Sequence, residues 1–324
     1  MVKIYHSKQL NANFLVELKN NLAKQFADCN KIAIKIHFGE PGNNKSFTPE
    51  QIKPITDILH SLNINFFLYD SSVAYDSPRN NPESHKKIAI EKGWGKLGEI
   101  KTDDEYITVK GENMSYQVCK SLVDADGVLV ISHIKGHICS GFGGAIKNLG
   151  MGALTKKTKS DIHSGGEPKI VGECTLCKAC EKCCPINGIT VTDKPEINTC
   201  YGCSNCTYVC PAGVLVPKLN YFDVLLAEGA SVAESQFKKK YYVSYLINIA
   251  KECDCEVDPK QIISDDRGYL MGEDAVAIDK AAYDLIAVNG DVFKKFNKKS
   301  GTEQINAAEK FGMGTKDYEL VELD

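Results

Sequence analysis

Eight cysteines between residues 174 and 210 fall into two copies of one spacing. The first copy is Cys174-x-x-Cys177-x-x-Cys180-x-x-x-Cys184-Pro185, and the second has the same gaps from Cys200 to Cys210-Pro211. Runs of this form ligate cubane iron–sulfur clusters, and the fourth cysteine of each run ligates the other cluster. The spacing therefore predicts two [4Fe–4S] clusters, one held by Cys174, Cys177, Cys180 and Cys210 and the other by Cys200, Cys203, Cys206 and Cys184.

Structural zinc and a disulfide framework are the alternatives for these cysteines. Zinc usually takes four ligands from two separated Cys-x₂-Cys pairs, which matches three cysteines in seven residues poorly. Disulfides suit secreted proteins, and the N-terminal sequence lacks the apolar run of a signal peptide. The other six of the 14 cysteines are Cys29, Cys119, Cys139, Cys183, Cys253 and Cys255. Retained thiols indicate a reducing cytoplasm, and low-potential clusters suggest an anaerobic organism.

The length of 324 residues allows two domains. We expect residues 1–166 and 218–324 to build one α/β domain, a mostly parallel sheet flanked by helices, into which residues 167–217 insert a ferredoxin-like module. Strands alternating with helices favour this class. The predicted strands span 31–38, 64–69, 127–132, 242–249 and, as an edge strand, 318–323. The predicted helices span 49–62, 83–92, 116–123, 222–237, 274–285 and 302–311, the first with a capping box formed by Thr48 and Gln51.

Polar side chains follow three of the predicted strands. Lys35 and His37 end the first with Glu40 close behind, Asp70 and Ser71 end the second, and His133, Lys135 and His137 end the third. Ligands of open parallel sheets bind outside the carboxyl ends of the strands. The pattern predicts an anion-binding or acid–base site in which Lys35, His37, His133, Lys135 and His137 are catalytic and Asp70 binds substrate. A solvated sheet edge is the alternative.

Two further motifs lie outside this pattern. The glycine-rich segment from Gly141 to Gly152 resembles a helix entry that binds an anion, with Gly143, Gly144 and Lys147 as substrate-binding residues, although tight packing of helix on sheet explains the glycines equally well. Cys253 and Cys255 point the same way if the chain is extended, and with His163 or His137 they are candidates for an additional metal ion or a redox centre. An inert surface turn is the alternative for this pair.

These stretches together resemble the domain of unknown function 362 family, in the branch with an inserted two-cluster ferredoxin. The resemblance rests on residues 35–42, 132–137, 141–152, 163–164, 253–255 and 275–279. Relatives usually carry Asp-Pro where this chain has Asp274-Ala275, so this turn is expected to differ. The resemblance implies an iron–sulfur protein of cytoplasmic, mostly anaerobic prokaryotes, and it supplies no reaction.

We therefore expect a redox protein whose two clusters pass electrons to or from an anion-binding site in the α/β domain. A non-enzymatic carrier that docks a partner oxidoreductase is the first alternative, and an iron–sulfur sensor or cluster-handling protein is the second. The expected partner is a redox protein or a small-molecule electron donor or acceptor. With a net charge of −3 and no long apolar stretch, neither nucleic acid nor a membrane is expected, and a homodimer is compatible with the composition.

Overall fold

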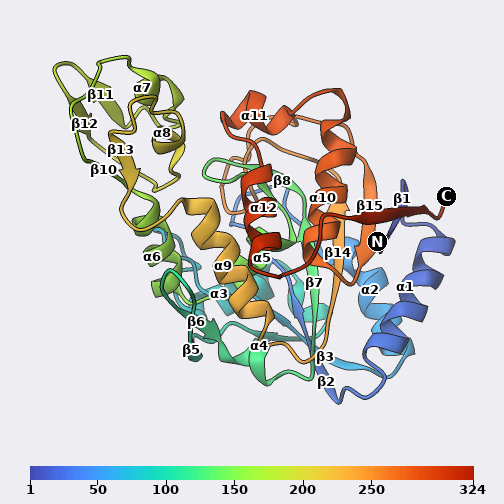
Figure 1. Cartoon of the computed structure of the whole chain (residues 1–324). Coiled ribbons are helices and arrows are strands. Elements are labelled where there is room, and N and C mark those ends of the chain that lie inside the picture. Colours follow the sequence, from blue (N-terminus) through green and yellow to red (C-terminus); the bar gives the residue numbers. More distant parts are fainter.

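The computed structural model describes residues 1–324, and an eight-stranded sheet forms its centre (Figure 1). All neighbouring strands are parallel except where β15 lies antiparallel to both β1 and β14. The prediction of a mostly parallel sheet is confirmed. In spatial order the strands are β16 (Tyr318–Glu322), β1 (Val2–Ser7), β15 (Gly268–Gly272), β14 (Lys240–Leu246), β7 (Gly127–His133), β2 (Lys31–Lys35), β3 (Asn65–Tyr69) and β4 (Glu99–Lys101).

Helices cover both faces of this sheet and create two apolar cores. Side chains alternate between the faces of a strand, so Ile32 and Ile34 enter one core while Ala33 enters the other. The first core packs under α1 (Ala12–Gln25), α2 (Pro49–Ser61) and α3 (Pro82–Glu91). The second packs under α5 (Ala145–Gly152), α9 (Phe222–Glu234), α10 (Ala275–Ile286) and α12 (Thr302–Lys310).

Two predicted helix starts are confirmed at the level of single hydrogen bonds. The Thr48 N–H donates to Oε1 of Gln51 at 3.0 Å, which completes the capping box of α2. Asp274 caps α10 by accepting hydrogen bonds from the N–H groups of Val276 and Ala277 at 2.9 and 2.8 Å. A carboxylate at this position satisfies N–H groups that have no partner within the helix. The shorter elements of this domain are α4 (Lys120–Asp124), α11 (Val292–Asn297), η1 (Trp94–Lys96) and η2 (Ala287–Asn289).

The helix predicted over residues 116–123 is wrong. Residues Ser115–Cys119 form strand β6, which pairs with β5 (Tyr106–Lys110), and only the short helix α4 follows. Tyr116 and Val118 are buried while Ser115 and Gln117 are more exposed, which is the period of a strand and not of a helix. The predicted strand over 31–38 also ends earlier, at Lys35, so that His37 lies in the following loop.

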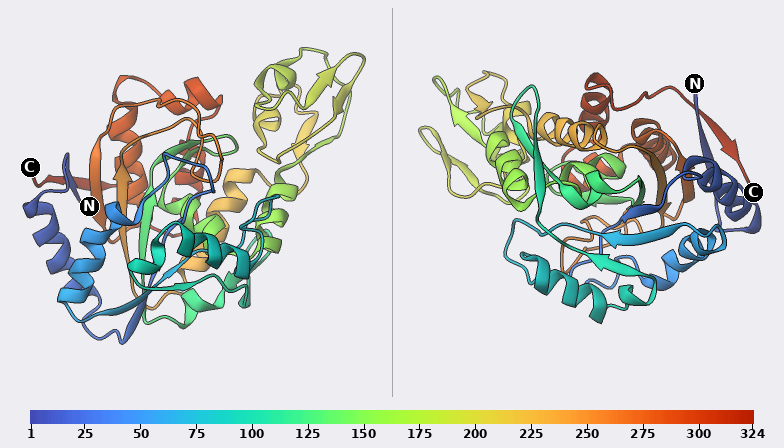
Figure 2. Two further views of the ribbon diagram at one scale, coloured as in Figure 1. Left: turned by 180° about the vertical axis from the view of Figure 1, so that it is seen from behind. Right: turned by 90° about the horizontal axis from the view of Figure 1, so that it is seen from below.

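Residues 168–217 stand apart from the sheet at the end of α6 (Lys156–Gly166), as both views in Figure 2 also show. The first and last strands of this lobe are antiparallel neighbours, with Pro168 opposite Pro217, so the chain enters and leaves side by side. Its elements are β10 (Pro168–Ile170), α7 (Ala179–Cys183), β11 (Ile189–Val191), β12 (Pro195–Ile197), α8 (Asn205–Tyr208) and β13 (Leu215–Pro217). None of the helices of the protein combines the length and apolar character needed to span a lipid bilayer.

Candidate functional site

The two cysteine runs fold into two copies of the same backbone path. In the first copy, Leu176, Lys178 and Asn187 have φ values of 57°, 57° and 53°. In the second copy the equivalent residues, each 26 positions later in the sequence, are Gly202, Ser204 and Gly213, with φ values of 66°, 61° and 63°. Non-glycine residues adopt this left-handed region rarely. The turns also aim N–H groups at sulfur, as from Leu176 to Cys174 Sγ at 3.3 Å and from Gly202 to Cys200 Sγ at 3.2 Å.

One cavity brings together four of these cysteines from both runs. The cavity is lined by Cys184 of the first run and by Cys200, Cys203 and Cys206 of the second. None of the eight cysteines of the runs takes part in a disulfide. Cys180 and Cys184 pack with Cys206 in a small apolar core, against which Cys174 and Cys210 also lie.

The second cysteine run packs closely against the α/β domain, while the first run meets it where Lys298 donates to the backbone oxygens of Lys182 and Cys184. Cys203 belongs to the larger apolar core of that domain. A side chain on Gly202 would lie 1.8 Å from the backbone oxygen of His163 in α6, so only glycine permits this close approach. The Lys299 ammonium donates to the backbone oxygen of Cys203 at 2.7 Å and to that of Cys139 at 2.9 Å. Lys299 thus joins the lobe to the strand-end region.

At the carboxyl ends of β2 and β3, Lys35 and Asp70 form a buried ion pair. The Lys35 ammonium lies 3.0 Å from Oδ1 of Asp70 and donates to Oδ1 of Asn148 at 2.8 Å. Burial alone would raise the pKa of Asp70, but the charge of Lys35, with a smaller contribution from Arg79, outweighs it and holds that pKa below its ordinary value. Asp70 therefore stays ionised at neutral pH.

His37 lies beside a second buried ion pair. Arg79 donates to Oε2 of Glu40 through Nε at 2.9 Å, and its Nη1 lies 3.1 Å from Nε2 of His37. The N–H of Gly39 donates to the other ring nitrogen of His37 at 3.0 Å. Burial and the Arg79 charge hold the pKa of His37 well below its ordinary value, so the imidazole is neutral.

His133 and Lys135 hold neighbouring loops. The ring nitrogens of His133 lie 2.8 Å from Oδ2 of Asp254 and 2.9 Å from the backbone oxygen of Ile247, and its ring stacks on Phe47. Lys135 donates to the backbone oxygens of Lys45 and Asn248. These contacts engage both side chains within the protein, so the structure does not bring them to an open site together with Lys35 and His37.

A carboxylate from the protein itself, that of Asp279, occupies the helix start in the glycine-rich segment. The N–H groups of Ala145 and Ile146, at the start of α5, donate to the two carboxylate oxygens of Asp279 at 2.7 and 2.9 Å. A side chain on Gly144 would lie 2.2 Å from that carboxylate. The interpretation of Gly143 and Gly144 as a substrate-binding turn is therefore not supported, because Asp279 already occupies the helix terminus. Burial raises the pKa of Asp279 to about 7.

Lys147 differs from the other cations of this region. Its half-buried side chain has no salt bridge, whereas Lys35 and Arg79 are both paired. Burial lowers the pKa of Lys147 to about 8, although Asp254 and the Cys139 thiol oppose this shift. Of the two charged residues predicted to bind substrate, Asp70 is paired with Lys35, and Lys147 has no charged partner within the protein.

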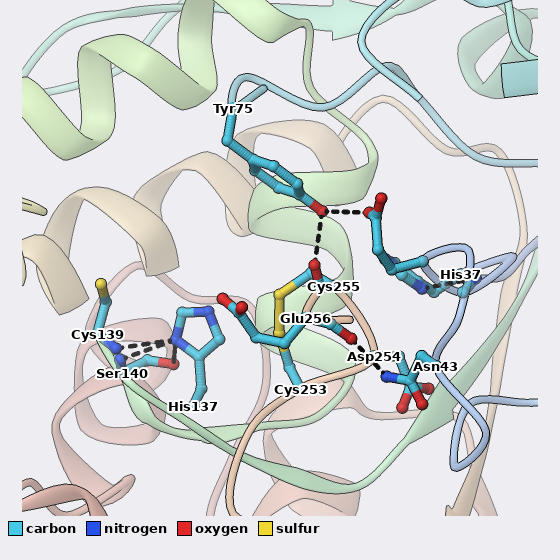
Figure 3. The surroundings of a disulfide bond; sticks show 12 residues. His37, Asn43, Tyr75, His137, Cys139, Ser140, Cys253, Asp254, Cys255 and Glu256 are labelled. Atoms are coloured by element: carbon cyan, nitrogen blue, oxygen red, sulfur yellow. Dashed lines mark hydrogen bonds between the residues drawn. A yellow bond between two sulfur atoms is a disulfide. The ribbon is translucent and has the colours of Figure 1, made fainter. Parts of the chain in front are cut away.

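Cys253 and Cys255 lie in the loop between β14 and β15 and are joined by a disulfide (Figure 3). His137 ends β8 (Lys135–His137), the strand that follows β7 and pairs with β9 (Gly141–Gly143). A ring nitrogen of His137 and the two sulfurs all lie within 4.8 Å of one another. Because β7 and β14 are parallel neighbours, their carboxyl ends bring these residues together across more than a hundred positions. His163 instead lies 2.7 Å from the Tyr201 backbone oxygen, beside the lobe.

Sequence reasoning missed Arg79, Asp254, Cys139 and Lys299 as members of this region. Arg79 is one of only two arginines in a chain that otherwise uses lysine, and a lone arginine in a polar loop is a usable signal for a buried carboxylate partner. Nothing comparable marks Lys299, whose place depends on how α11 meets the lobe.

Comparison with known proteins identifies a ferredoxin-like module and a family. Ferredoxin-3 of Chlorobaculum tepidum is 40% identical over 57 residues, which are 15% of this chain and 92% of that protein. This likeness points to an iron–sulfur protein.

Two solved structures share a distant likeness with the chain. A Thermotoga maritima protein aligns with 91% of this chain and 59% of its own length, at 9% identity and a TM-score of 0.40. The lactate racemase apoprotein from Thermoanaerobacterium thermosaccharolyticum aligns with 76% of this chain and 50% of its own length, at 10% identity and a TM-score of 0.34. The chain thus spans about three-fifths of the length of the first structure and half of the length of the second.

The family described as "Domain of unknown function (DUF362)" matches residues 32–284. That range includes the strand-end residues Lys35, His137 and Cys255 together with the whole ferredoxin-like lobe. The chain belongs to the DUF362 family.

Proposed function

We propose that the protein is a two-cluster iron–sulfur redox protein that passes electrons between a partner and the strand-end site of its α/β domain. Cys174, Cys177, Cys180 and Cys210 would hold one [4Fe–4S] cluster, and Cys200, Cys203, Cys206 and Cys184 the other. Such clusters supply one-electron transfer at low potential. The observation that carries the proposal is the cavity in which Cys184 joins the three cysteines of the second run. This grouping is expected if the fourth cysteine of each run ligates the cluster of the other run.

The two cysteine sets differ in their distance from the α/β domain, which gives the electron path a direction. Cys203, of the second set, packs into the core of the α/β domain, whereas Cys177, of the first set, is exposed. A partner would therefore exchange electrons at the first set. Exposed apolar side chains in and just before the first run suit such docking: Ile170, Val171 and Leu176. The same surface favours a non-enzymatic electron carrier as the second candidate function.

Metal analysis tests the cluster proposal directly. Protein purified without oxygen should contain about eight iron and eight acid-labile sulfide per chain, because each cubane holds four of each. After reduction, electron paramagnetic resonance should show two S = 1/2 centres in magnetic interaction. Zinc without sulfide would show that the cysteines form structural zinc sites, and the proposal would then fail.

Lys147 is the residue that we propose to bind an anionic small molecule. Its pKa of about 8 means that the ammonium loses its proton as the pH rises through 8. Binding of sulfate, whose charge is constant in this range, should therefore weaken by about tenfold for each pH unit above 8. Titration calorimetry at pH 7 and pH 9.5 measures the change.

Two variants of Lys147 sharpen this measurement. Lys147→Arg keeps its charge at pH 9.5 and should bind sulfate equally at both pH values, whereas Lys147→Met should not bind at either. Sulfate binding by the unsubstituted protein that does not vary with pH would show that another group holds the anion.

A further inference from the structure

Cys253 and Cys255 differ in access to solvent while sharing one neighbour, His137. The Cys253 side chain is buried, and that of Cys255 is half-buried at the edge of the strand-end region. The Tyr75 hydroxyl lies 3.0 Å from the Cys255 backbone oxygen and fixes that side of the loop. Figure 3 shows His137 on one side of the sulfurs and Tyr75 on the other. The pair is therefore held in place on both sides, and one of its sulfurs can meet a second molecule.

The hydrogen bonds of His137 distinguish a redox pair from a metal site. Its Nδ1 accepts from the N–H groups of Cys139 and Ser140 at 3.2 and 3.1 Å, so the proton of the neutral ring lies on Nε2. Histidines that ligate metals do the reverse, because they use one lone pair for the metal and donate a hydrogen bond from the other nitrogen. Burial, then the charge of Lys147, holds the pKa of His137 well below its ordinary value. His137 is thus a neutral imidazole that carries its N–H on Nε2, within the same small cluster as the two sulfurs.

Hydrogen bonds link the second cysteine run of the lobe to His137, the neighbour of this pair. Lys299 bridges the backbone oxygens of Cys203 and Cys139. The N–H of Cys139 then donates to His137, whose ring lies beside the two sulfurs. Each hydrogen bond of this route is 3.2 Å or shorter.

We propose that Cys253 and Cys255 form a redox-active disulfide that collects two electrons from the iron–sulfur lobe and reduces a small-molecule disulfide. This inference rests on the proposed function for its source of electrons. In reduction, the sulfur–sulfur bond breaks, two electrons arrive singly from the two reduced clusters, and two protons bind. Both protons come from solvent, and the neutral His137 ring keeps its Nε2 proton. The clusters are oxidised in this step, and a low-potential one-electron donor reduces them again.

The dithiol then acts by exchange with its substrate. The more accessible Cys255 thiolate attacks one sulfur of the substrate and releases the other half as a thiolate. The Cys253 thiolate next attacks Cys255, which restores the disulfide and releases the second half. In sum, one substrate disulfide takes up two electrons and two protons and becomes two thiols. The His137 N–H and the unpaired Lys147 ammonium favour the thiolate form of the pair.

Reductive titration of the intact protein tests the coupling. Under argon with a photoreduced viologen, the protein should accept about four electrons per chain, one for each cluster and two for the disulfide. The Cys253→Ser/Cys255→Ser variant should accept about two, with the iron content and cluster spectra unchanged. Alkylation followed by mass spectrometry should label Cys253 and Cys255 after reduction only, while Cys29 serves as an internal control.

Trapping with oxidised glutathione tests the substrate class. Reduced Cys253→Ser should form a mixed disulfide with glutathione at Cys255, because no second thiol resolves it. Reduced Cys255→Ser should form at least tenfold less at Cys253, whose sulfur is buried. Equal labelling of the two variants would contradict the assigned order of attack.

His137 is a positioning residue in this proposal. The rate at which reduced Cys255 is alkylated measures the effect of His137 on the reactivity of that thiol. His137→Leu removes the donor and should slow the reaction of reduced Cys255 with iodoacetamide at pH 7 by about tenfold. His137→Gln keeps an N–H donor and should recover most of this rate. A purely structural role would change both variants alike.

Failure of this inference is distinguishable from failure of the proposed function. If the clusters are present but the protein accepts only two electrons and both thiols are labelled before reduction, the disulfide is not a redox centre and the cluster proposal stands. If a metal ion is lost in the double serine variant, the pair is a metal site and the inference is wrong. If iron and sulfide are absent, the proposed function fails, and the source of electrons fails with it.

Discussion

Replacing Cys184 with alanine should halve the iron and sulfide content, from about eight to about four of each per chain. Cys184 belongs to the first run in sequence, but its sulfur lines the cavity of Cys200, Cys203 and Cys206. The cluster lost should therefore be the one held by the second run. The spectrum of the remaining cluster should match that of Cys206→Ala and differ from that of Cys180→Ala.

The neighbouring cysteine provides a matched control for this substitution. Cys183 is a free, half-buried thiol next to Cys184, and it is not one of the eight cysteines predicted to hold the clusters. Cys183→Ala should keep about eight iron per chain and the interaction between the two spins. If Cys184→Ala instead resembles Cys180→Ala, each run would hold its own cluster and the exchanged ligation would be wrong.

Replacing Asp70 with alanine should destabilise the protein by about 3–5 kcal/mol, because it leaves a buried charge without its partner. Asp70 is 2% exposed and Lys35 is fully buried. After the substitution, the Lys35 ammonium would keep only neutral oxygen atoms, those of Asn148 and of the Ile36 backbone. Urea unfolding measures this loss. Comparing protein without clusters and protein with clusters separates the loss of stability in the α/β domain from any effect on the lobe.

The same ion pair predicts the response of stability to acid. A carboxyl group whose pKa is lowered in the folded protein stabilises it above the pKa of the unfolded chain, near 3.9, and this contribution is lost as the pH falls below that value. The unsubstituted protein should therefore lose stability below about pH 4, and Asp70→Ala should lack this part of the loss. The double variant Lys35→Met/Asp70→Leu should recover much of the stability at pH 7. A double variant as unstable as Asp70→Ala would show that the cost lies in packing and not in the unpaired charge.

Local sequence patterns predicted the elements of the α/β domain well where a clear strand alternation or a helix cap marks the element. The alternation of Ile32 and Ile34 and the capping box at Thr48 both appear as expected. The pattern failed at residues 116–123, where the first residues pair with β5 across a short turn. Pairing with another strand can override the helical preference of a short segment. The sequence of the segment alone does not show whether such a partner strand exists.

The candidate site was predictable in location but only partly in roles. Strand ends placed Lys35, Asp70 and His137 in one region, and the cysteine pair lies there as predicted. Sequence does not show which charges neutralise each other, so Asp279 at the start of α5 and Asp254 beside His133 were not foreseen. Such pairings depend on loops that meet only in the folded chain. The identity of the third partner of the cysteines, His137 and not His163, depends on the same loop geometry.

The position of β1 in the sheet has a consequence for the order in which the protein assembles. β1 is the first strand of this sheet to be synthesised, yet its two neighbours, β15 and β16, follow more than 250 residues later. Contacts of such high sequence separation slow folding, so both edges of β1 stay unpaired until β15 has been synthesised. An unpaired strand edge is prone to aggregation in this interval. Synthesis rate and chaperone access should therefore affect the yield of this protein more than its final stability does.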